Sequence, residues 1–251
     1  MTTPSGGAST GAGRFFGVGL GPGDPELVTL KAARLIAEAD VVAYHAGVGK
    51  QSNARRIAAS LIPTDAVEEE LRYPVTTGHT AHPGGYAGAM ADFYEESAAR
   101  LIAHLELGRT VVLLAEGDPL FYGSYMHLHV RLSPRYETEI VAGVTGMSGC
   151  WSAIGTPIAQ GDDVFTVLPG TLPEYELERR LADTDAAVVM KIGRHLAKVR
   201  RALDRAGRLD RAIYVERGTM ANASVMKLTD KLDTFAPYFA MVLVPGWETR
   251  P

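Results

Sequence analysis

The chain of 251 residues lacks several features that mark common classes of protein. It has one cysteine, Cys150, which excludes a disulfide within the chain and any zinc site built from several cysteines. No apolar run approaches the roughly 20 residues that a membrane-spanning helix needs. The formal net charge is −4 and there is no lysine-rich block, which argues against nucleic acid as the main partner. We therefore expect a cytoplasmic protein that binds neither nucleic acid nor membrane.

Common nucleotide-binding and catalytic motifs are also missing. A dinucleotide-binding fingerprint starting at Gly17 would need its third glycine at Pro22. One starting at Gly19 would need it at Asp24. The P-loop sequence Gly-Lys-Ser/Thr, the GxSxG elbow of serine hydrolases and the HExxH pair of metalloproteases do not occur. These absences argue against a Rossmann-type oxidoreductase and a serine hydrolase, and no metal site is expected.

What the chain does have is an alternation of apolar strands and amphipathic helices. This alternation predicts an α/β protein with largely parallel sheets, whose ligand sites lie at the carboxyl ends of the strands. Strands are expected at 15–18, 41–44, 110–115, 139–141, 164–168, 186–191, 212–216 and 239–244. Helices are expected at 25–38, 53–61, 87–107 and 194–206. The predicted organisation is a disordered tail (1–13), an N-terminal α/β domain (14–134) and a C-terminal α/β domain (135–251).

The tripeptide Gly-Asp-Pro occurs twice, at 23–25 and at 117–119, each time between an apolar strand and a predicted helix. Asp24 and Asp118 suit helix N-caps, where a carboxylate accepts a backbone N–H. The same loops are rich in glycine, which lets a ligand approach the backbone closely. Both interpretations stay open and are compatible. A loop that ends in an aspartate fits a neutral or cationic ligand better than a phosphate.

A basic segment occurs in the second half of the chain. Residues 191–208 include seven lysines and arginines and one acid, Asp204. One interpretation is a solvated helix face, and the other is a positive rim that attracts a polyanionic substrate.

Four motifs in this order resemble a known family. GVGLGPGDPELVTLKA, LLAEGDPLFYGSYMHLH, VAGVTGMSG and YVERGTM are similar to segments of the tetrapyrrole (class III) methyltransferases of corrin and sirohaem synthesis. The similarity extends over about residues 14–245. It implies two α/β domains, an active site with S-adenosyl-L-methionine in the cleft between them, and a homodimer. YPVTT…HPGGY, VLPGTLPE and VMKIGRHLAKVRRAL look most like the subgroup that methylates C20 of the anionic tetrapyrrole precorrin-2.

The resemblance also assigns expected roles to individual residues. Those expected to bind the methyl donor are Pro22, Glu116, Gly117, Asp118, Phe121, Tyr122, Thr145, Gly146, Met190, Lys191, Gly218, Phe239 and Ala240. Gly146 departs from the alanine or serine that the family usually has there. Basic residues expected to pair with substrate carboxylates are Arg55, Arg56, Arg72, Lys191, Arg194 and Lys198, and Gly21 is expected to border the substrate. Candidate bases for the final proton loss are Asp24, Glu216, Tyr44 and His45, and loss of that proton to solvent is the alternative.

Other functions remain open at this point. Within the family, the substrate is alternatively a cobalt-containing tetrapyrrole, or the methylated carbon is at another ring position. Outside it, the chain is a tetrapyrrole-binding module without catalytic activity. Direct hand-over of product to the next enzyme of the pathway is a further possibility.

Overall fold

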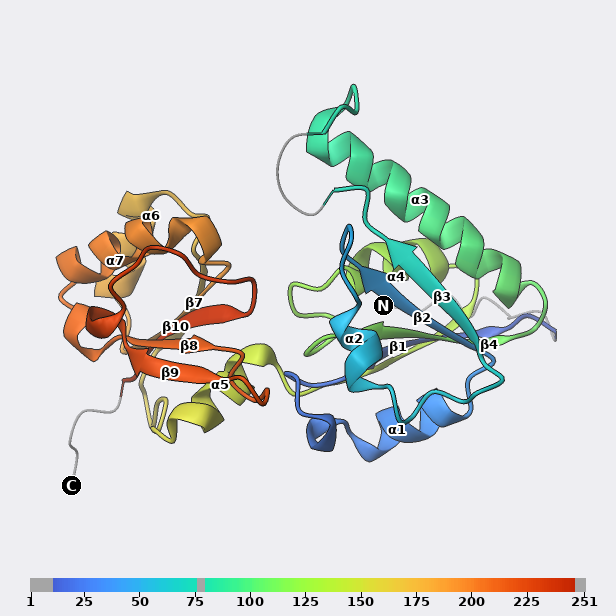
Figure 1. Cartoon of the computed structure of the whole chain (residues 1–251), viewed down its shortest axis with the longest axis horizontal. Helices are drawn as coiled ribbons and strands as arrows, with labels where there is room; N and C mark the ends of the chain where they lie inside the picture. The colour runs from blue at the N-terminus through green and yellow to red at the C-terminus, as the bar shows by residue number, and fades with distance from the viewer. Residues whose placement is uncertain (1–10, 76–79, 247–251) are drawn as a thin grey trace, which may run out of the picture. The chain divides into compact units, whose positions relative to one another are not determined.

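The computed structural model describes residues 11–75 and 80–246 (Figure 1). The chain divides into two compact units, Met1–Thr145 and Gly146–Pro251. Within the described residues, no helix is both long enough and apolar enough to cross a membrane. The same residues contain no group of three or more histidine, cysteine, aspartate or glutamate side chains placed to hold a metal ion.

The first unit is built on a five-stranded sheet in the order β3-β2-β4-β1-β5, and every neighbouring pair is parallel. The strands are β1 (Arg14–Gly19), β2 (Val41–Ala46), β3 (Val67–Arg72), β4 (Thr110–Ala115) and β5 (Glu137–Val141). The helices are η1 (Pro25–Leu27), α1 (Leu30–Ala37), α2 (Asn53–Ile57), α3 (Gly85–Leu105) and α4 (Tyr125–Leu132). The expected parallel sheet is confirmed for this unit, and β4 has the predicted bounds.

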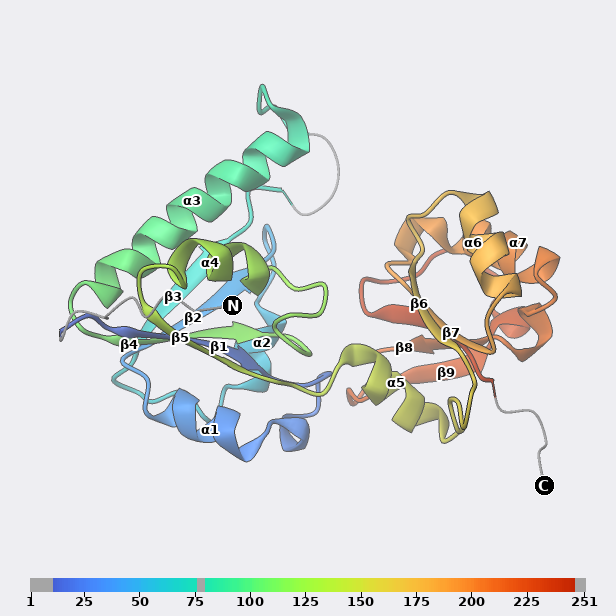
Figure 2. The same cartoon turned by 180° about the vertical axis from the view of Figure 1, so that it is seen from behind.

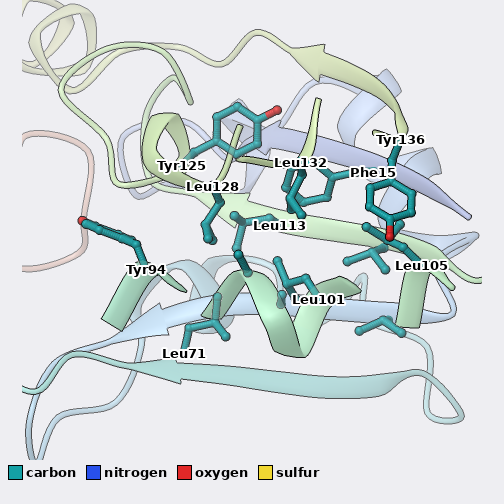
Figure 3. Close-up of a cluster of buried hydrophobic side chains, with 14 of the residues drawn as sticks. Phe15, Leu71, Tyr94, Leu101, Leu105, Leu113, Tyr125, Leu128, Leu132 and Tyr136 are labelled. Atoms are coloured by element: carbon teal, nitrogen blue, oxygen red, sulfur yellow. The ribbon is translucent and has the colours of Figure 1, made fainter. Parts of the chain in front are cut away.

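The central strands β1 and β4 are almost wholly buried because helices cover both faces of the sheet. Consecutive strand residues face opposite sides, so Phe15 belongs to one core and Phe16 to the other. Figure 3 shows the first core, where side chains of α3 and α4 such as Leu101 and Leu128 pack on the sheet. The second core joins the opposite face to α1 and α2. The continuous apolar runs of the sequence thus become strands in the middle of a parallel sheet.

The second unit has a mixed sheet in the order β6-β7-β10-β8-β9. Its strands are β6 (Phe165–Pro169), β7 (Ala186–Met190), β8 (Ile213–Glu216), β9 (Ser224–Lys227) and β10 (Ala240–Val244). Only β6 and β7 pair in parallel, and the pairs made by β10 and by β8 with β9 are antiparallel. The expectation of a largely parallel sheet is therefore wrong here. The connection from β8 to β9, residues 217–223, is too short for the crossover that parallel strands require.

Helices cover both faces of this second sheet. They are α5 (Gly146–Ile154), α6 (Glu174–Ala182) and α7 (Leu196–Arg205), with the short 3-10 turns η2 (Gly193–His195), η3 (Leu209–Arg211) and η4 (Leu228–Asp230). Helices α6 and α7 lie together on one face, and α5 packs on the other through Cys150 and Trp151 (Figures 1 and 2).

Two expectations about boundaries change. Strand β5 follows the expected boundary at residue 134 but pairs with β1, so the division falls between Thr145 and Gly146. Most of the expected tail, residues 1–10, lies outside the described residues. Gly13, at its end, is buried and donates its N–H to the Leu105 carbonyl at 2.7 Å.

The helix expected at 25–38 is interrupted. Val28 is extended (φ −70°, ψ 130°), and α1 begins after Thr29, whose hydroxyl accepts the Ala32 N–H at 3.2 Å. Strand β3 was not predicted because its sequence, VEEELR, is mostly charged. It is an edge strand, where polar side chains are accommodated, and the apolar pattern that signals a central strand is missing.

Candidate functional site

Three loops meet at the carboxyl edge of the first sheet, after the neighbouring strands β4, β1 and β5. Gly21 and Gly117 exchange backbone hydrogen bonds, with N···O distances of 2.8 and 3.3 Å. The loop after β5 joins them because the Gly143 N–H donates to Asp118 Oδ2 at 3.0 Å. The two Gly-Asp-Pro segments of the sequence therefore belong to one structural feature.

Glycine is needed where these loops touch. A Cβ on Gly19 would lie 2.6 Å from the Gly143 nitrogen and 2.7 Å from the Gly117 oxygen. A Cβ on Gly143 would lie 2.1 Å from the same Gly117 oxygen. These are backbone atoms held by the hydrogen bonds between the loops, so they cannot rotate away as a side chain would.

The two aspartates of the repeated tripeptide form similar turns. Asp24 Oδ1 accepts the N–H of Glu26, and Asp118 Oδ1 accepts that of Leu120, both at 2.9 Å. Asp24 is the N-cap of η1, which confirms the expected cap. Asp118 caps no helix, because α4 begins only at Tyr125, and its second oxygen instead holds Gly143.

Glu116, which starts the loop after β4, reaches the first turn of α2. Its carboxylate accepts hydrogen bonds from the Asn53 side chain and the Ala54 N–H. Burial raises the pKa of Glu116, while these two bonds and the nearby Arg56 oppose the rise. Asn53 was not predicted from the sequence, because only the fold brings α2 beside the loop after β4.

The other residues of these loops that were expected to bind the donor are Pro22, Gly117, Phe121, Tyr122 and Thr145. Pro22 is partly exposed, Gly117 has a positive φ of 67°, and Tyr122 has one of 56°. The rings of Phe121 and Tyr122 meet edge to face with centroids 5.0 Å apart. Thr145 ends the first unit and is partly exposed.

Tyr44 and His45 are consecutive on β2, so their side chains lie on opposite faces of the sheet. The Tyr44 hydroxyl donates to Glu68 Oε2 at 2.9 Å, and Arg55 donates to both oxygens of Glu68 at 3.0 Å. Burial, followed by this carboxylate, raises the pKa of Tyr44. Tyr44 is therefore a protonated member of a Tyr–Glu–Arg cluster.

His45 lies in an aromatic cluster. Its ring stacks on Tyr73 at 5.3 Å between centroids and meets Phe93 at 6.0 Å, and its Nε2 has no hydrogen-bond partner within the described residues. Burial, with a smaller contribution from His127, lowers the pKa of His45 from 6.5 to about 4. The imidazole is therefore neutral at neutral pH.

The buried His45 makes stability depend on pH. Its pKa is lower in the folded chain (about 4) than in the unfolded chain (6.5), so the unfolded state takes up the proton first as the pH falls. We expect the free energy of unfolding to drop between pH 6.5 and 4, by up to about 3 kcal/mol, and His45→Phe to remove most of this dependence. Urea unfolding at about pH 5 and about pH 7.5 measures it. The pKa of His127 is also lowered, so His127→Gln is the control, and an equal pH dependence in wild type and His45→Phe would contradict the assignment.

In the second unit, several expected residues gather at one edge of the sheet. Ala240 pairs with Glu216, and the Phe239 carbonyl accepts the N–H of Arg217 at 2.8 Å. Gly218 lies against α5, where a Cβ would come 2.9 Å from the Cα of Cys150. Gly146, at the start of α5, faces Met241, and Met190 ends the neighbouring strand β7. Lys191, which follows β7, has a positive φ of 55°.

The carboxylate of Glu216 is already surrounded by donors. Its Oε1 accepts the Tyr214 hydroxyl at 2.5 Å, and its Oε2 accepts Arg217 Nη1 at 3.2 Å. The buried Lys231 Nζ lies 3.9 Å from Oε1 and 4.6 Å from the Tyr214 ring centroid. This arrangement is a polar cluster that joins β8 to the segment after β9.

Most side chains of the basic segment 191–208 make contacts within their own unit. Arg201 and Arg205 pair with Glu174, at 2.6 and 3.1 Å. Lys198, Arg200 and Arg208 donate to backbone carbonyls. Arg194 is exposed on η2. These contacts anchor five of the seven basic side chains in the fold, and of these only Arg201 and Arg205 are paired with a carboxylate.

Comparison with known proteins gives consistent matches. Residues 14–232 match the family described as tetrapyrrole (corrin/porphyrin) methylases. A precorrin-2 C(20)-methyltransferase of Sinorhizobium sp is 57% identical over 97% of this chain and 100% of that protein. The cobalamin biosynthesis protein CobIJ of Mycobacterium tuberculosis is 56% identical over 95% of this chain, which spans 47% of that longer protein. A cobalt-precorrin-2 C(20)-methyltransferase of Salmonella typhimurium is 27% identical over 94% of this chain and 98% of that protein.

Solved structures share the fold. A cobalt precorrin-4 methyltransferase has a TM-score of 0.71 and 24% identity, covering 92% of this chain and 94% of that one. A uroporphyrin-III C-methyltransferase of Thermus thermophilus, complexed with S-adenosyl homocysteine, has a TM-score of 0.65 and 24% identity, covering 93% and 98%.

Proposed function

The chain belongs to the tetrapyrrole (corrin/porphyrin) methylase family, and we propose that it transfers the methyl group of S-adenosyl-L-methionine to C20 of precorrin-2, giving precorrin-3A in cobalamin biosynthesis. The observation that supports this choice of substrate is the 57% identity along the whole length of a precorrin-2 C(20)-methyltransferase. The alternation of strands and helices and the four motifs agree with the class.

The composition of the three loops after β1, β4 and β5 suits binding of such a methyl donor. Residues 20–24, 116–119 and 142–145 include Asp24, Glu116 and Asp118 but no lysine or arginine. A site of this composition favours a cationic sulfonium over a phosphate. When bound, S-adenosyl-L-methionine supplies an electrophilic methyl group on a sulfur that leaves without acid catalysis. The donor-binding residues of both units, as predicted from the sequence, form part of this proposal.

The chain's own contribution is to hold the reacting carbon in line with the methyl group. A new C–C bond forms as the S–CH₃ bond breaks, and the methylated carbon then loses its proton to a base or to water. Positioning of this kind accounts for the larger part of such an acceleration. The backbone hydrogen bonds between Gly21 and Gly117, and the bond from the Gly143 N–H to the Asp118 carboxylate, support this role because they order the loops before ligand binds.

Binding of S-adenosyl-L-homocysteine tests the class of donor. Calorimetric titration of the purified chain is expected to give saturable binding, and NADP, as a control ligand, none. If the folded protein does not bind S-adenosyl-L-homocysteine, the proposed donor site is wrong. The result would then favour the alternative of a tetrapyrrole-binding module without catalytic activity.

Asp24 is the first candidate for the base, and Asp24→Asn tests it. Asparagine keeps an oxygen for the Glu26 N–H, so the turn should persist while the basic carboxylate is lost. We expect turnover to fall about 100-fold or more, with S-adenosyl-L-homocysteine affinity nearly intact. Steady-state kinetics and calorimetry measure the two effects. Unchanged turnover would remove Asp24 as the base and favour Glu216, His45, Tyr44 or proton loss to solvent.

The metal content of the substrate is a separate question. The 57% relative is named for precorrin-2, and the 27% relative is named for cobalt-precorrin-2. We therefore propose the metal-free tetrapyrrole as substrate. Parallel assays with the metal-free and the cobalt-containing compound distinguish the two, and faster methylation of the cobalt compound would reverse the assignment.

The assembly and location of the protein are proposals as well. We propose a cytoplasmic homodimer, as the family resemblance implies, which light scattering coupled to size exclusion tests. The existence of a relative about twice as long, CobIJ, supports hand-over of product to the next enzyme of the pathway.

A further inference from the structure

We infer that an open cavity of the first unit, beside α2, binds a carboxylate side chain of the tetrapyrrole substrate; this inference rests on the proposed function. The cavity has a volume of about 480 Å³ and lies where β2 and β3 end. Its chemically important lining residues are Tyr44, Lys50, Arg55, Arg56, Glu70 and Arg72. Four of these six residues are cationic and one is a carboxylate, so the lining has a net positive charge in a chain whose net charge is −4.

Two of these cations, Lys50 and Arg56, have no carboxylate of the described residues within 4 Å. Arg55 is paired with Glu68, and Arg72 with Glu70. Within the described part of the first unit, Lys50, Arg56 and Arg109 are the lysines and arginines without a carboxylate partner within 4 Å. Arg109 bonds to His104 instead, and the other two face this cavity. An anion that enters the cavity therefore meets two unpaired positive charges.

The cavity is joined to the proposed donor site. Arg56 Nη2 donates to Asn53 Oδ1 at 2.7 Å, and the Asn53 side chain in turn donates to Glu116 in the loop after β4. Strand β2 is the immediate neighbour of β4, and both strands end at the same edge because they are parallel. Neighbouring strands are about 5 Å apart, so the distance from the cavity to this loop is short enough for one tetrapyrrole to span.

This placement gives the cavity a role in orientation. A carboxylate held by Arg56 and Lys50 restricts the rotation of the tetrapyrrole ring about the donor loop. A guanidinium binds a carboxylate with directional, charge-assisted hydrogen bonds, and the ammonium adds charge without fixed geometry. The cavity beside α2 then decides which carbon of the tetrapyrrole ring faces the methyl group.

The test removes the two unpaired charges. The double variant Lys50→Gln/Arg56→Gln is compared with wild type in three measurements: KM and kcat for precorrin-2, fluorescence titration with uroporphyrin III as an air-stable octacarboxylic probe, and calorimetry with S-adenosyl-L-homocysteine. We expect KM and the uroporphyrin Kd to rise about 10-fold or more, and the affinity for S-adenosyl-L-homocysteine to change much less, because Arg56 reaches Glu116 only through Asn53. Salt should raise KM in wild type and much less in the variant, because the screened charges are gone.

A matched control removes equal charge elsewhere in the same unit. Lys31→Gln/Arg34→Gln neutralises two cations of α1 that are already paired with Glu139 and Glu38. This control should leave the uroporphyrin Kd unchanged, and Arg56→Lys, which keeps the charge, should retain most of the affinity. An equal loss in the control would assign the effect to net charge and overturn the cavity site.

The remaining outcomes separate this inference from the proposed function. An unchanged uroporphyrin Kd in the double variant overturns the cavity site even if the enzyme methylates precorrin-2 as proposed. A rise in that Kd in a protein that fails to bind S-adenosyl-L-homocysteine supports the cavity and overturns the methyltransferase proposal. Inorganic phosphate is a further probe. If phosphate binds to wild type but not to the double variant, while the variant leaves the uroporphyrin Kd unchanged, the cavity binds a free anion and the inference is overturned.

Discussion

Gly143→Ala is expected to destabilise the first unit and to abolish donor binding at working concentrations. The new methyl group would lie 2.1 Å from the Gly117 oxygen, in the loop after β4, and 2.8 Å from the Gly19 Cα, at the end of β1. Separation of the three loops is then unavoidable, and the hydrogen bond from Gly143 to Asp118 is lost with it. We expect a loss of about 3 kcal/mol in the free energy of unfolding and a Kd for S-adenosyl-L-homocysteine raised about 100-fold.

Urea denaturation and calorimetry measure these effects, and Gly85→Ala provides the control. Gly85 has a positive φ of 62°, and no described atom lies within 4 Å of the place that an alanine methyl group would take, so alanine there carries only the cost of the left-handed conformation. That cost is about 1 kcal/mol. Equal destabilisation by the two variants would show that the loops after β1, β4 and β5 are not tightly packed.

Asp118→Ala should produce the second large effect. Its carboxylate holds two backbone N–H groups, that of Leu120 in its own loop and that of Gly143 in the loop after β5. Removal leaves both donors without this partner, which we expect to cost about 3 kcal/mol of unfolding free energy. Loss of the tie should also weaken S-adenosyl-L-homocysteine binding by about 10-fold or more, since the loop after β4 is no longer ordered.

Two further variants make the Asp118 experiment specific. Asp118→Asn keeps an oxygen for one N–H but presents an amide to the other, so an intermediate loss is expected. Asp65→Ala removes an exposed carboxylate that makes no hydrogen bond or ion pair within the described residues, and it should leave stability and affinity unchanged. If Asp118→Ala lowers stability but leaves donor affinity intact, the tie supports the fold and not the binding site.

The sequence predicted the first unit well because local pattern and tertiary environment agree there. The apolar run 110–115 becomes β4 with its predicted bounds, since a strand covered by helices on both faces has few polar positions. The cap at Asp24 follows from side-chain chemistry between near neighbours and was also predictable. Edge strand β3 was missed because its glutamates face arginines and histidines distant in sequence, such as Arg55 and His104.

The second unit was harder to predict for a physical reason. Whether a strand pairs in parallel or antiparallel depends on how the chain returns to the sheet. The apolar composition of a run such as 240–244 does not distinguish the two. The loop between β8 and β9 is compatible only with an antiparallel return, and β10 then lies between β7 and β8. The boundary after Thr145 likewise depends on the pairing of β5 with β1, which no local pattern reveals.

By itself, the sequence determined the family, the alternation of elements and the loops that carry the two Gly-Asp-Pro segments. These are properties of neighbouring residues, whose spacing is set along the chain. Only the tertiary structure decided which charges remain unpaired. It pairs Arg201 and Arg205 of the basic segment 191–208 with Glu174, and it leaves Arg56 and Lys50 without a described carboxylate within 4 Å beside α2. Pairing of charges depends on distances in space between residues far apart in the chain, and folding alone sets those distances.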